Sequence, residues 1–252
     1  MTGARRRPIE DAPRARSTGG RSIYAIGAVQ GRYDRLAVLL EAIVADLAAA
    51  PAGPTPLMVF CGDLIDRGPD APEVLAALVW LSRRAPAEVR VLRGQQEAAM
   101  LDFLDRPDTL HGWLAIGGEA TLQAYGVPPG SDAGVIRDAL IDRLPASHLA
   151  LLRAAAAETR CGDYVFGAAT TRTDKVLVHA GEAPASRRAL AIAPGGVGAL
   201  RLEGAAVEWL EADDAAAPFP YEPLPPDEPP PPPESTEVVT MRDALARLRP
   251  GY

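Results

Sequence analysis

Apolar and polar positions alternate along the first half of the chain in the way that consecutive strand and helix units require. Short apolar runs predict strands over residues 22–29, 57–61 and 88–92. Between them, apolar residues recur at helical spacing and predict amphipathic helices over 32–50 and 73–84. Units of this kind form a sheet whose strand-to-helix loops share one edge. We therefore expect three loops to meet at that edge.

The second half of the chain carries a different pattern. Helical spacing continues over residues 96–104, 133–144 and 147–159. From 164 to 211, short β-branched runs alternate with glycines, which predicts a second, largely antiparallel sheet. Residues 188–202 are expected to form its final hairpin. The predicted fold class is α/β, with two packed mixed β-sheets flanked by helices.

Both ends of the chain differ in composition from this domain, which we place at residues 22–212. Residues 1–21 hold six arginines and two acids, and they predict a disordered arm. Residues 213–236 are rich in proline and predict an extended polyproline II linker. Residues 237–252 predict a short C-terminal helix.

Composition and charge exclude several classes of partner. The formal net charge of −7 argues against a broad nucleic-acid surface, so we expect no nucleic-acid partner. No run approaches the ~20 apolar residues of a membrane helix, so no membrane partner is expected either. Two cysteines without a spaced pair, and no apolar signal segment, predict a reducing, cytoplasmic location.

The three loops expected at the sheet edge carry glycines together with polar or charged residues. They read Gly27-Ala28-Val29-Gln30-Gly31, Gly62-Asp63-Leu64-Ile65-Asp66-Arg67-Gly68 and Gly94-Gln95-Gln96-Glu97. The second loop places two carboxylates and an arginine where an α/β sheet presents charge. Taken alone, it could also be a turn in which Asp63 caps backbone amides and Asp66 pairs with Arg67.

In their order and spacing, these loops resemble the calcineurin-like metallophosphoesterases of the phosphoprotein phosphatase and diadenosine tetraphosphatase branch. Members read G-D-x-H-G, G-D-x-x-D-R-G and G-N-H-E, and later supply histidines in H-A-G and H-G-H-T contexts. The second motif is complete here, but the first carries Ala28 and Gln30, and the third carries Gln95 and Gln96. The resemblance covers residues 22–210.

The resemblance implies a role for each retained residue. Asp63 would bridge two divalent cations, such as Mn or Fe/Zn, that activate a water and hold phosphoryl oxygens. Arg67 would clamp the phosphate, because a guanidinium can bind two oxygens at once. Asp66 would orient a catalytic histidine.

The replaced positions argue against that chemistry. The catalytic histidine would stand at Gln96, whose amide cannot deliver a proton as an imidazole does. Ala28 offers no ligand atom, while Gln30 and Gln95 offer only neutral amide atoms, which are poor ligands for a transition metal. We therefore expect no bound metal cofactor.

One histidine of the distal half, His179, is a further candidate metal ligand. It ends an apolar run and fits either of the two histidine motifs of the family. We favour the H-G-H-T position, because residues 161–166 resemble the strand before H-A-G, whose histidine would then fall at Ala168. The alternative is a structural, hydrogen-bonded histidine. On either alignment, at most Asp63 and one histidine remain as ligands.

These observations predict a metallophosphoesterase-like protein that has lost phosphatase activity and binds a protein partner or a phosphorylated ligand at the Arg67 edge. One alternative is an active metal-dependent phosphatase or nucleotidyl hydrolase with substitute ligands such as Asp34, Glu97 or Asp174. Another is an interaction module that acts through its proline-rich tail.

Overall fold

The computed structural model describes residues 4–10, 12–13, 17–50, 53–128, 130, 132–167, 175–180, 189–192 and 197–212. One sheet contains β1 (Ala4–Pro8), β2 (Ile23–Gly27), β3 (Leu57–Phe60), β4 (Glu88–Val91), β9 (Gly198–Glu203) and β10 (Ala206–Ala212). The other contains β5 (Glu158–Cys161), β6 (Tyr164–Gly167), β7 (Val176–Ala180) and β8 (Ala189–Ile192). The helices are α1 (Tyr33–Ala49), α2 (Ala71–Arg84), α3 (Gln95–Asp105), α4 (Leu110–Leu114), α5 (Gly118–Ala124), α6 (Ala133–Arg143) and α7 (Ala146–Ala154), with a 3-10 turn at Pro107–Thr109.

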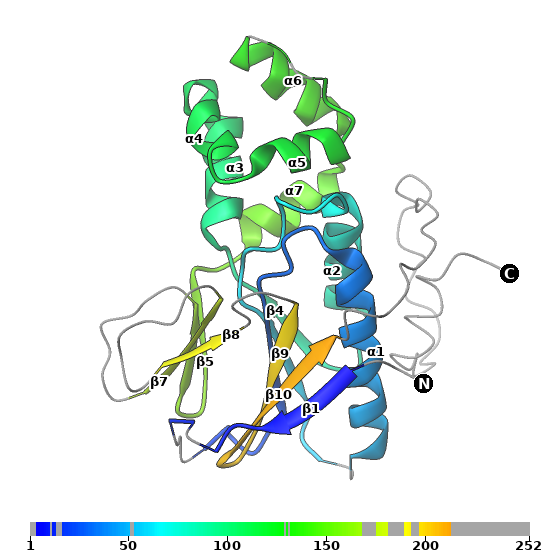
Figure 1. Cartoon of the computed structure of the whole chain (residues 1–252), viewed down its shortest axis with the longest axis vertical. Helices are drawn as coiled ribbons and strands as arrows, with labels where there is room; N and C mark the ends of the chain where they lie inside the picture. The colour runs from blue at the N-terminus through cyan, green and yellow to red at the C-terminus, as the bar shows by residue number, and fades with distance from the viewer. Residues whose placement is uncertain are drawn as a thin grey trace, which may run out of the picture.

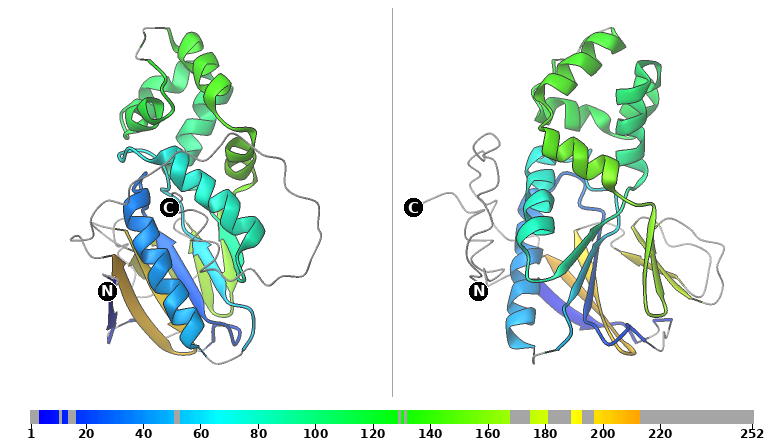
Figure 2. Two further views of the ribbon diagram at one scale, coloured as in Figure 1. Left: turned by 90° about the vertical axis from the view of Figure 1, so that its right-hand side faces the viewer. Right: turned by 180° about the vertical axis from the view of Figure 1, so that it is seen from behind.

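The two sheets pack face to face. The larger has the strand order β1-β10-β9-β2-β3-β4, and the smaller has the order β5-β6-β7-β8. Helices α1 and α2 cover the other face of the larger sheet, and α3 to α7 gather at one end of the sandwich (Figure 1; Figure 2). The predicted fold class is confirmed, because both sheets mix parallel and antiparallel pairs and helices flank them.

The first half of the chain folds as its apolar pattern predicts. Strands β2, β3 and β4 are parallel neighbours, connected through α1 and α2. The face of α1 that carries Leu36, Leu39 and Ile43 is buried against the sheet. The carboxyl ends of the three strands therefore lie at the same edge of the sheet, beneath helices α3 to α7, which we call the helical group (Figure 1).

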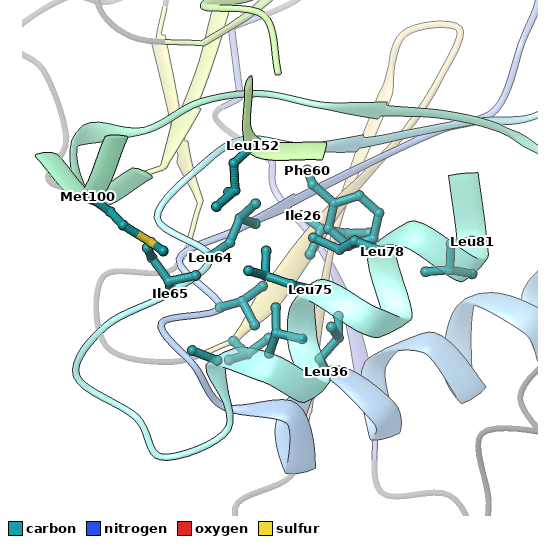
Figure 3. Close-up of a cluster of buried hydrophobic side chains, with 14 of the residues drawn as sticks. Ile26, Leu36, Phe60, Leu64, Ile65, Leu75, Leu78, Leu81, Met100 and Leu152 are labelled. Carbon is teal, nitrogen blue, oxygen red and sulfur yellow. The ribbon is translucent and has the colours of Figure 1, made fainter. Parts of the chain in front are cut away.

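Apolar residues inside the loop after β3 anchor it to the helices. Leu64 and Ile65 are fully buried and lie among side chains of α2, α3 and α7, including Leu75, Met100 and Leu152 (Figure 3). Full burial of a large aliphatic side chain contributes roughly 1.5–3 kcal/mol. The charged residues on either side of this pair are thus fixed to the core.

The second half departs from the prediction in strand direction and membership. Strand β7 runs parallel to both β6 and β8, so the expected antiparallel arrangement is wrong there. The β9–β10 hairpin joins the larger sheet beside β2, so residues 188–202 do not form one hairpin. The helix expected over 147–159 ends at Ala154, and Glu158 already belongs to β5. Short runs separated by glycines indicate strands but do not identify their partners.

The prediction of a disordered arm over residues 1–21 is wrong for much of the segment. Strand β1 pairs antiparallel with β10 along its whole length. Ile9 packs against the core between the sheets, Thr18 is buried, and Arg21 donates to the carbonyl oxygen of Thr55 at 2.7 Å. The predicted linker over 213–236 and the helix over 237–252 lie outside the described residues.

Acidic partners distant in the sequence hold this arginine-rich segment in place. Arg6 forms ion pairs with Asp46 of α1, at 2.8 Å, and with Glu208 of β10. Arg201 of β9 binds the same two acids, at 2.6 and 3.1 Å. Burial alone would raise the pKa of Asp46, but a hydrogen bond from Tyr24 and the charge of Arg201 hold this pKa below its ordinary value. The network joins β1, β9 and β10 to the helical layer.

Among the described helices, none has both the length and the apolar character needed to cross a membrane.

The network predicts unequal costs for its two arginines. Arg201→Met should lower the free energy of unfolding by about 3 kcal/mol, because the side chain is only 9% exposed and its loss leaves the partly buried acids Asp46 and Glu208 short of a partner. Arg6→Met should cost less than about 1 kcal/mol, because that side chain is 44% exposed. Urea unfolding measures both, with the exposed-pair variant Arg137→Met as a control. Equal losses at positions 6 and 201 would contradict the buried role of Arg201.

Candidate functional site

The three glycine-containing loops meet at the carboxyl ends of β2, β3 and β4, as the sequence predicts. The Gln30 amide donates to the carbonyl oxygen of Asp63 at 2.9 Å, and the Gly31 amide donates to that of Leu64 at 2.8 Å. These bonds join the first loop to the second through main-chain atoms alone. The amino acids that replace the expected ligands therefore do not prevent the loops from docking.

Glycines permit this close approach. A Cβ placed on Gly68 would lie 2.4 Å from the carbonyl oxygen of Gln30, and one on Gly62 would lie 2.5 Å from the amide nitrogen of Gly94. Neither contact is sterically possible, so any side chain at these positions would force the loops apart. The glycines of all three motifs serve the contact between loops.

Left-handed backbone is concentrated in the first two loops. Among the described non-glycine residues, positive φ occurs only at Ala28 (52°), Gln30 (50°), Asp63 (53°), Asp66 (65°) and Arg67 (58°). Each such conformation costs of order 1–3 kcal/mol, and it persists only where the surrounding structure imposes it. All five are positions that the sequence singles out as candidate site residues.

Glu97 ties the second loop to the third. Its fully buried carboxylate accepts hydrogen bonds from the amides of Asp63, Leu64, Ile65 and Gly94, at 3.0, 2.7, 3.2 and 2.8 Å. Burial raises the pKa of Glu97 to about 7, against the effect of these amides. The side chain is engaged in holding the backbone, which leaves it poorly placed to act as a substitute metal ligand.

Two further acids in the connection between β3 and α2, Asp63 and Asp70, interact with helix N-termini. The amides of Gln96 and Gln95 hydrogen-bond to the carboxyl group of Asp63, at the start of α3. The amide of Tyr33 does the same for Asp70, at the start of α1. Burial raises the pKa of both carboxyls, and the amides partly offset it. These contacts agree with the capping interpretation of Asp63.

Asp66 bonds to the helical group rather than to Arg67. The Thr121 hydroxyl donates to Asp66 Oδ1 at 2.6 Å, and the Trp113 indole N–H donates to Oδ2 at 3.0 Å. The Asp66 amide in turn donates to Thr121 Oγ1 at 3.0 Å. Burial raises the pKa of Asp66 to about 6, although these two donors lower it. The Asp66–Arg67 pair that the turn interpretation expects is not formed, because Asp66 is buried whereas Arg67 is exposed.

Arg67 lies against the turn before α5. Its amide donates to the carbonyl oxygen of Gly117 at 3.4 Å, and a Cβ on Gly117 would lie 2.9 Å from Arg67 Cγ. The exposed guanidinium forms no ion pair within the described part of the chain. The sequence gives no spacing that connects residues 113–121 to Asp66 and Arg67, so sequence reasoning missed this contact.

Two more candidate positions carry buried atoms without partners. Gln96 is 4% exposed, and its Oε1 has no hydrogen-bond partner among the described residues. His179 ends β7 with Nδ1 3.2 Å from the carbonyl oxygen of Ala180, while the buried Nε2 lacks a described partner. A Cβ on Gly27 would lie 3.1 Å from Ala180 Cβ, so the end of β7 adjoins the first loop. Ala168, the alternative histidine position, lies outside the described residues.

The side chains at this edge do not fit a two-metal centre. Ala28 has no donor atom and Gln30 and Gln95 offer neutral amides, so Asp63, whose Oδ1 is buried without a described partner, is the one charged ligand that the three loops offer among the expected positions. Within the described ranges, no group of three or more histidine, cysteine or acidic side chains could hold a metal ion. Of the substitute ligands, Asp34 pairs with Arg32 at 2.7 Å, and Asp174 lies outside the described residues.

No protein-family model matches the sequence, and no curated protein matches it either. A crystal structure of a candidate diadenosine tetraphosphatase matches with a TM-score of 0.49 and 11% identity, over 78% of this chain and 96% of its own. A metallophosphoesterase from Sphaerobacter thermophilus matches with a TM-score of 0.43 and 12% identity, over 77% and 88%.

A cold-active protein-tyrosine phosphatase from a psychrophilic Shewanella matches with a TM-score of 0.32 and 19% identity. The match covers 57% of this chain but only 40% of the phosphatase. At these scores and identities, the similarities establish neither a family nor an activity for this chain.

The loop contacts predict opposite effects for two glycine substitutions. Gly68→Ala should lower the free energy of unfolding by about 2 kcal/mol or more, because the new Cβ would meet main-chain oxygens at 2.4 and 2.6 Å. Gly112→Ala, within α4, meets nothing within 4 Å and should raise stability by up to about 1 kcal/mol. Urea unfolding of the two variants checks the sign. A neutral Gly68→Ala would show that the loops are not held by this approach.

The buried acids predict a pH dependence of stability. The ordinary pKa values of 3.8 for Asp66 and 4.5 for Glu97 rise on folding to about 6 and about 7. Between these limits the native state binds more protons than the unfolded state, so the stabilisation is complete below about pH 4 and is lost as the pH rises towards 7.

Asp66→Asn should remove part of this dependence. Between pH 4 and 6, the free energy of unfolding of the variant should fall less steeply, by up to about 1.4 kcal/mol per pH unit. Urea unfolding across this range gives the slope, and Asp102→Asn, an exposed acid of α3, is the matched control. Identical slopes in the two variants would place the Asp66 pKa near its ordinary value.

Proposed function

We propose that this chain is a metallophosphoesterase-like protein that has lost phosphatase activity and binds a phosphorylated ligand at Arg67. The observation that carries the proposal is how the charged groups of the second loop are divided. The carboxylates of Asp63, Asp66 and Glu97 bond to helix N-termini, side-chain donors and loop amides. The guanidinium of Arg67 is exposed and unpaired within the described residues.

An exposed guanidinium without an ion-pair partner among the described residues suits a phosphate group. It can bind two phosphate oxygens with parallel hydrogen bonds, and it stays charged at any physiological pH. The backbone of Arg67 is fixed by its left-handed conformation and by the Gly117 contact, so less ordering is needed on binding. Recognition of the phosphorylated ligand therefore needs no metal.

The proposed loss of phosphatase activity follows from the metal ligands and the catalytic histidine that the loops lack. Hydrolysis in the family that the motifs resemble needs a water whose pKa is lowered by metal ions and a histidine that transfers a proton. Gln96 occupies the histidine position, and an amide does not titrate. Ala28 supplies no ligand atom to the same edge.

A second candidate function is a metal-dependent phosphatase or nucleotidyl hydrolase with an altered site. Asp63 Oδ1 and Gln96 Oε1 are both buried without a partner among the described residues, which favours a ligand in their vicinity. Carboxylate and amide oxygens suit hard cations such as Mg²⁺ or Mn²⁺. On this hypothesis the two oxygens would be ligands of a working metal site.

Phosphate binding tests the first proposal. Titration calorimetry with inorganic phosphate should give a binding isotherm for the unaltered chain, weakened at least about tenfold in Arg67→Ala. Arg84→Ala, which removes an exposed arginine at the end of α2, is the matched control and should leave the affinity unchanged. Equal affinities in all three proteins, or no binding to any, would overturn the proposal.

Metal content and turnover separate the two candidates. The chain is incubated with manganese, desalted and measured by elemental analysis, and hydrolysis of 4-nitrophenyl phosphate is followed in parallel. We expect less than one metal ion per chain and no turnover above a buffer control. Turnover that is lost in Asp63→Ala but kept in Asp102→Asn would instead establish the hydrolase.

A further inference from the structure

A single segment of the helical group makes the described hydrogen bonds to the carboxylate and amide of Asp66 and to the amide of Arg67. Trp113 of α4 and Thr121 of α5 donate to the two carboxylate oxygens of Asp66. Gly117, between these helices, accepts from the Arg67 amide. The segment 113–121 therefore holds two consecutive residues of the loop by four hydrogen bonds, counting the one that Thr121 accepts.

The two residues that it holds need external support. Asp66 and Arg67 have φ values of 65° and 58°, in a backbone region that non-glycine residues rarely adopt. A strained pair of this kind relaxes unless its surroundings fix it. The direction in which the Arg67 side chain leaves the loop depends on this backbone conformation.

The supporting segment is itself rigidly packed. The indole of Trp113 stacks on Phe103 of α3 with ring centroids 5.4 Å apart. A Cβ on Gly118 would lie 2.5 Å from the indole, so the backbone of α5 lies directly against the ring. A displacement of this segment would therefore be transmitted to the loop rather than absorbed.

Resting on the function proposed above, we infer that Thr121 and Trp113 are positioning residues for Arg67. They hold the Asp66 carboxylate, and through it they fix the backbone that presents the guanidinium to the phosphate. The resemblance would give Asp66 the role of orienting a catalytic histidine. Here Asp66 instead joins the helical group to the ligand-binding loop. Ligand binding at Arg67 and docking of segment 113–121 are thus coupled, and each stabilises the other.

Removal of one hydroxyl tests this inference. Thr121→Val keeps the side-chain shape but removes the donor to Asp66 Oδ1 and the acceptor for its amide. We expect hydrogen exchange of the Arg67 amide to accelerate at least about tenfold, and affinity for inorganic phosphate to fall about fivefold. Thr121→Ser should restore both. Thr109→Val, which loses a hydroxyl bond to Arg106 elsewhere in the helical group, should change neither.

A second pair of variants covers the case in which Thr121→Val does not fold. Trp113→Phe removes the indole donor together with part of the ring that packs on Phe103. Trp209→Phe is its control for the lost ring volume, because the buried Nε1 of Trp209 has no described partner. Exchange should accelerate at Arg67 in Trp113→Phe while the strands of the larger sheet keep their protection. Global acceleration would indicate a role in stability alone and overturn the inference.

The exchange readout keeps the two proposals apart. If the unaltered chain binds no phosphate, the proposed function fails, while local exchange at Arg67 still decides whether segment 113–121 fixes that residue. If Thr121→Val and Trp113→Phe both keep normal exchange at Arg67, the positioning role is wrong even where phosphate binds.

Discussion

The carboxylate of Glu97 is the group on which the geometry of this edge depends. It receives four main-chain amides from two loops. The loop it holds also caps the helices on either side, through Asp63 at α3 and Asp70 at α1. A loop that fixes two helices and a sheet edge supports the fold independently of any catalytic role. These contacts give the residues of the second loop a structural role that needs no metal.

The buried acids remain close to one another in the absence of a described cation between them. Burial and the charge of Asp63 raise the pKa of both Asp66 and Glu97, whereas the donors Thr121 and Trp113 and the charge of Arg67 lower that of Asp66. Each acid has nevertheless found donors within the protein, so burial is tolerated. The resemblance would give Asp63 a metal and Asp66 a catalytic histidine, but here Asp66 accepts from a hydroxyl and an indole N–H, and main-chain amides lie at Asp63. The identity of a motif residue thus did not determine its partner.

The parallel half of the fold could be predicted because its signals are local. Apolar spacing identified β2, α1, β3, α2 and β4, and glycines marked where their loops approach. Apart from the end of the helix expected over 147–159, the failures involve partners far apart in the sequence. Arg6 pairs with Glu208, which lies near the other end of the domain sequence. Asp66 accepts a hydrogen bond from Thr121, and no pattern in the sequence connects these two residues. A run of arginines alone predicts a solvated arm, because the acids that pair with it are distant in the sequence and come near only in the folded structure.

The pairing of β1 with β10 has a consequence for where this domain can be divided. With β1 in place, the backbone groups along the outer side of β10 are hydrogen-bonded, and the sheet ends at a strand bearing arginines and a proline. A fragment that begins at residue 22, where composition alone would set the boundary, would leave β10 as an open edge. An unpaired edge strand accepts any extended chain that meets it, including another copy of itself. Residues 4–8 therefore close an edge of the sheet that would otherwise be open to pairing with a second copy of the chain.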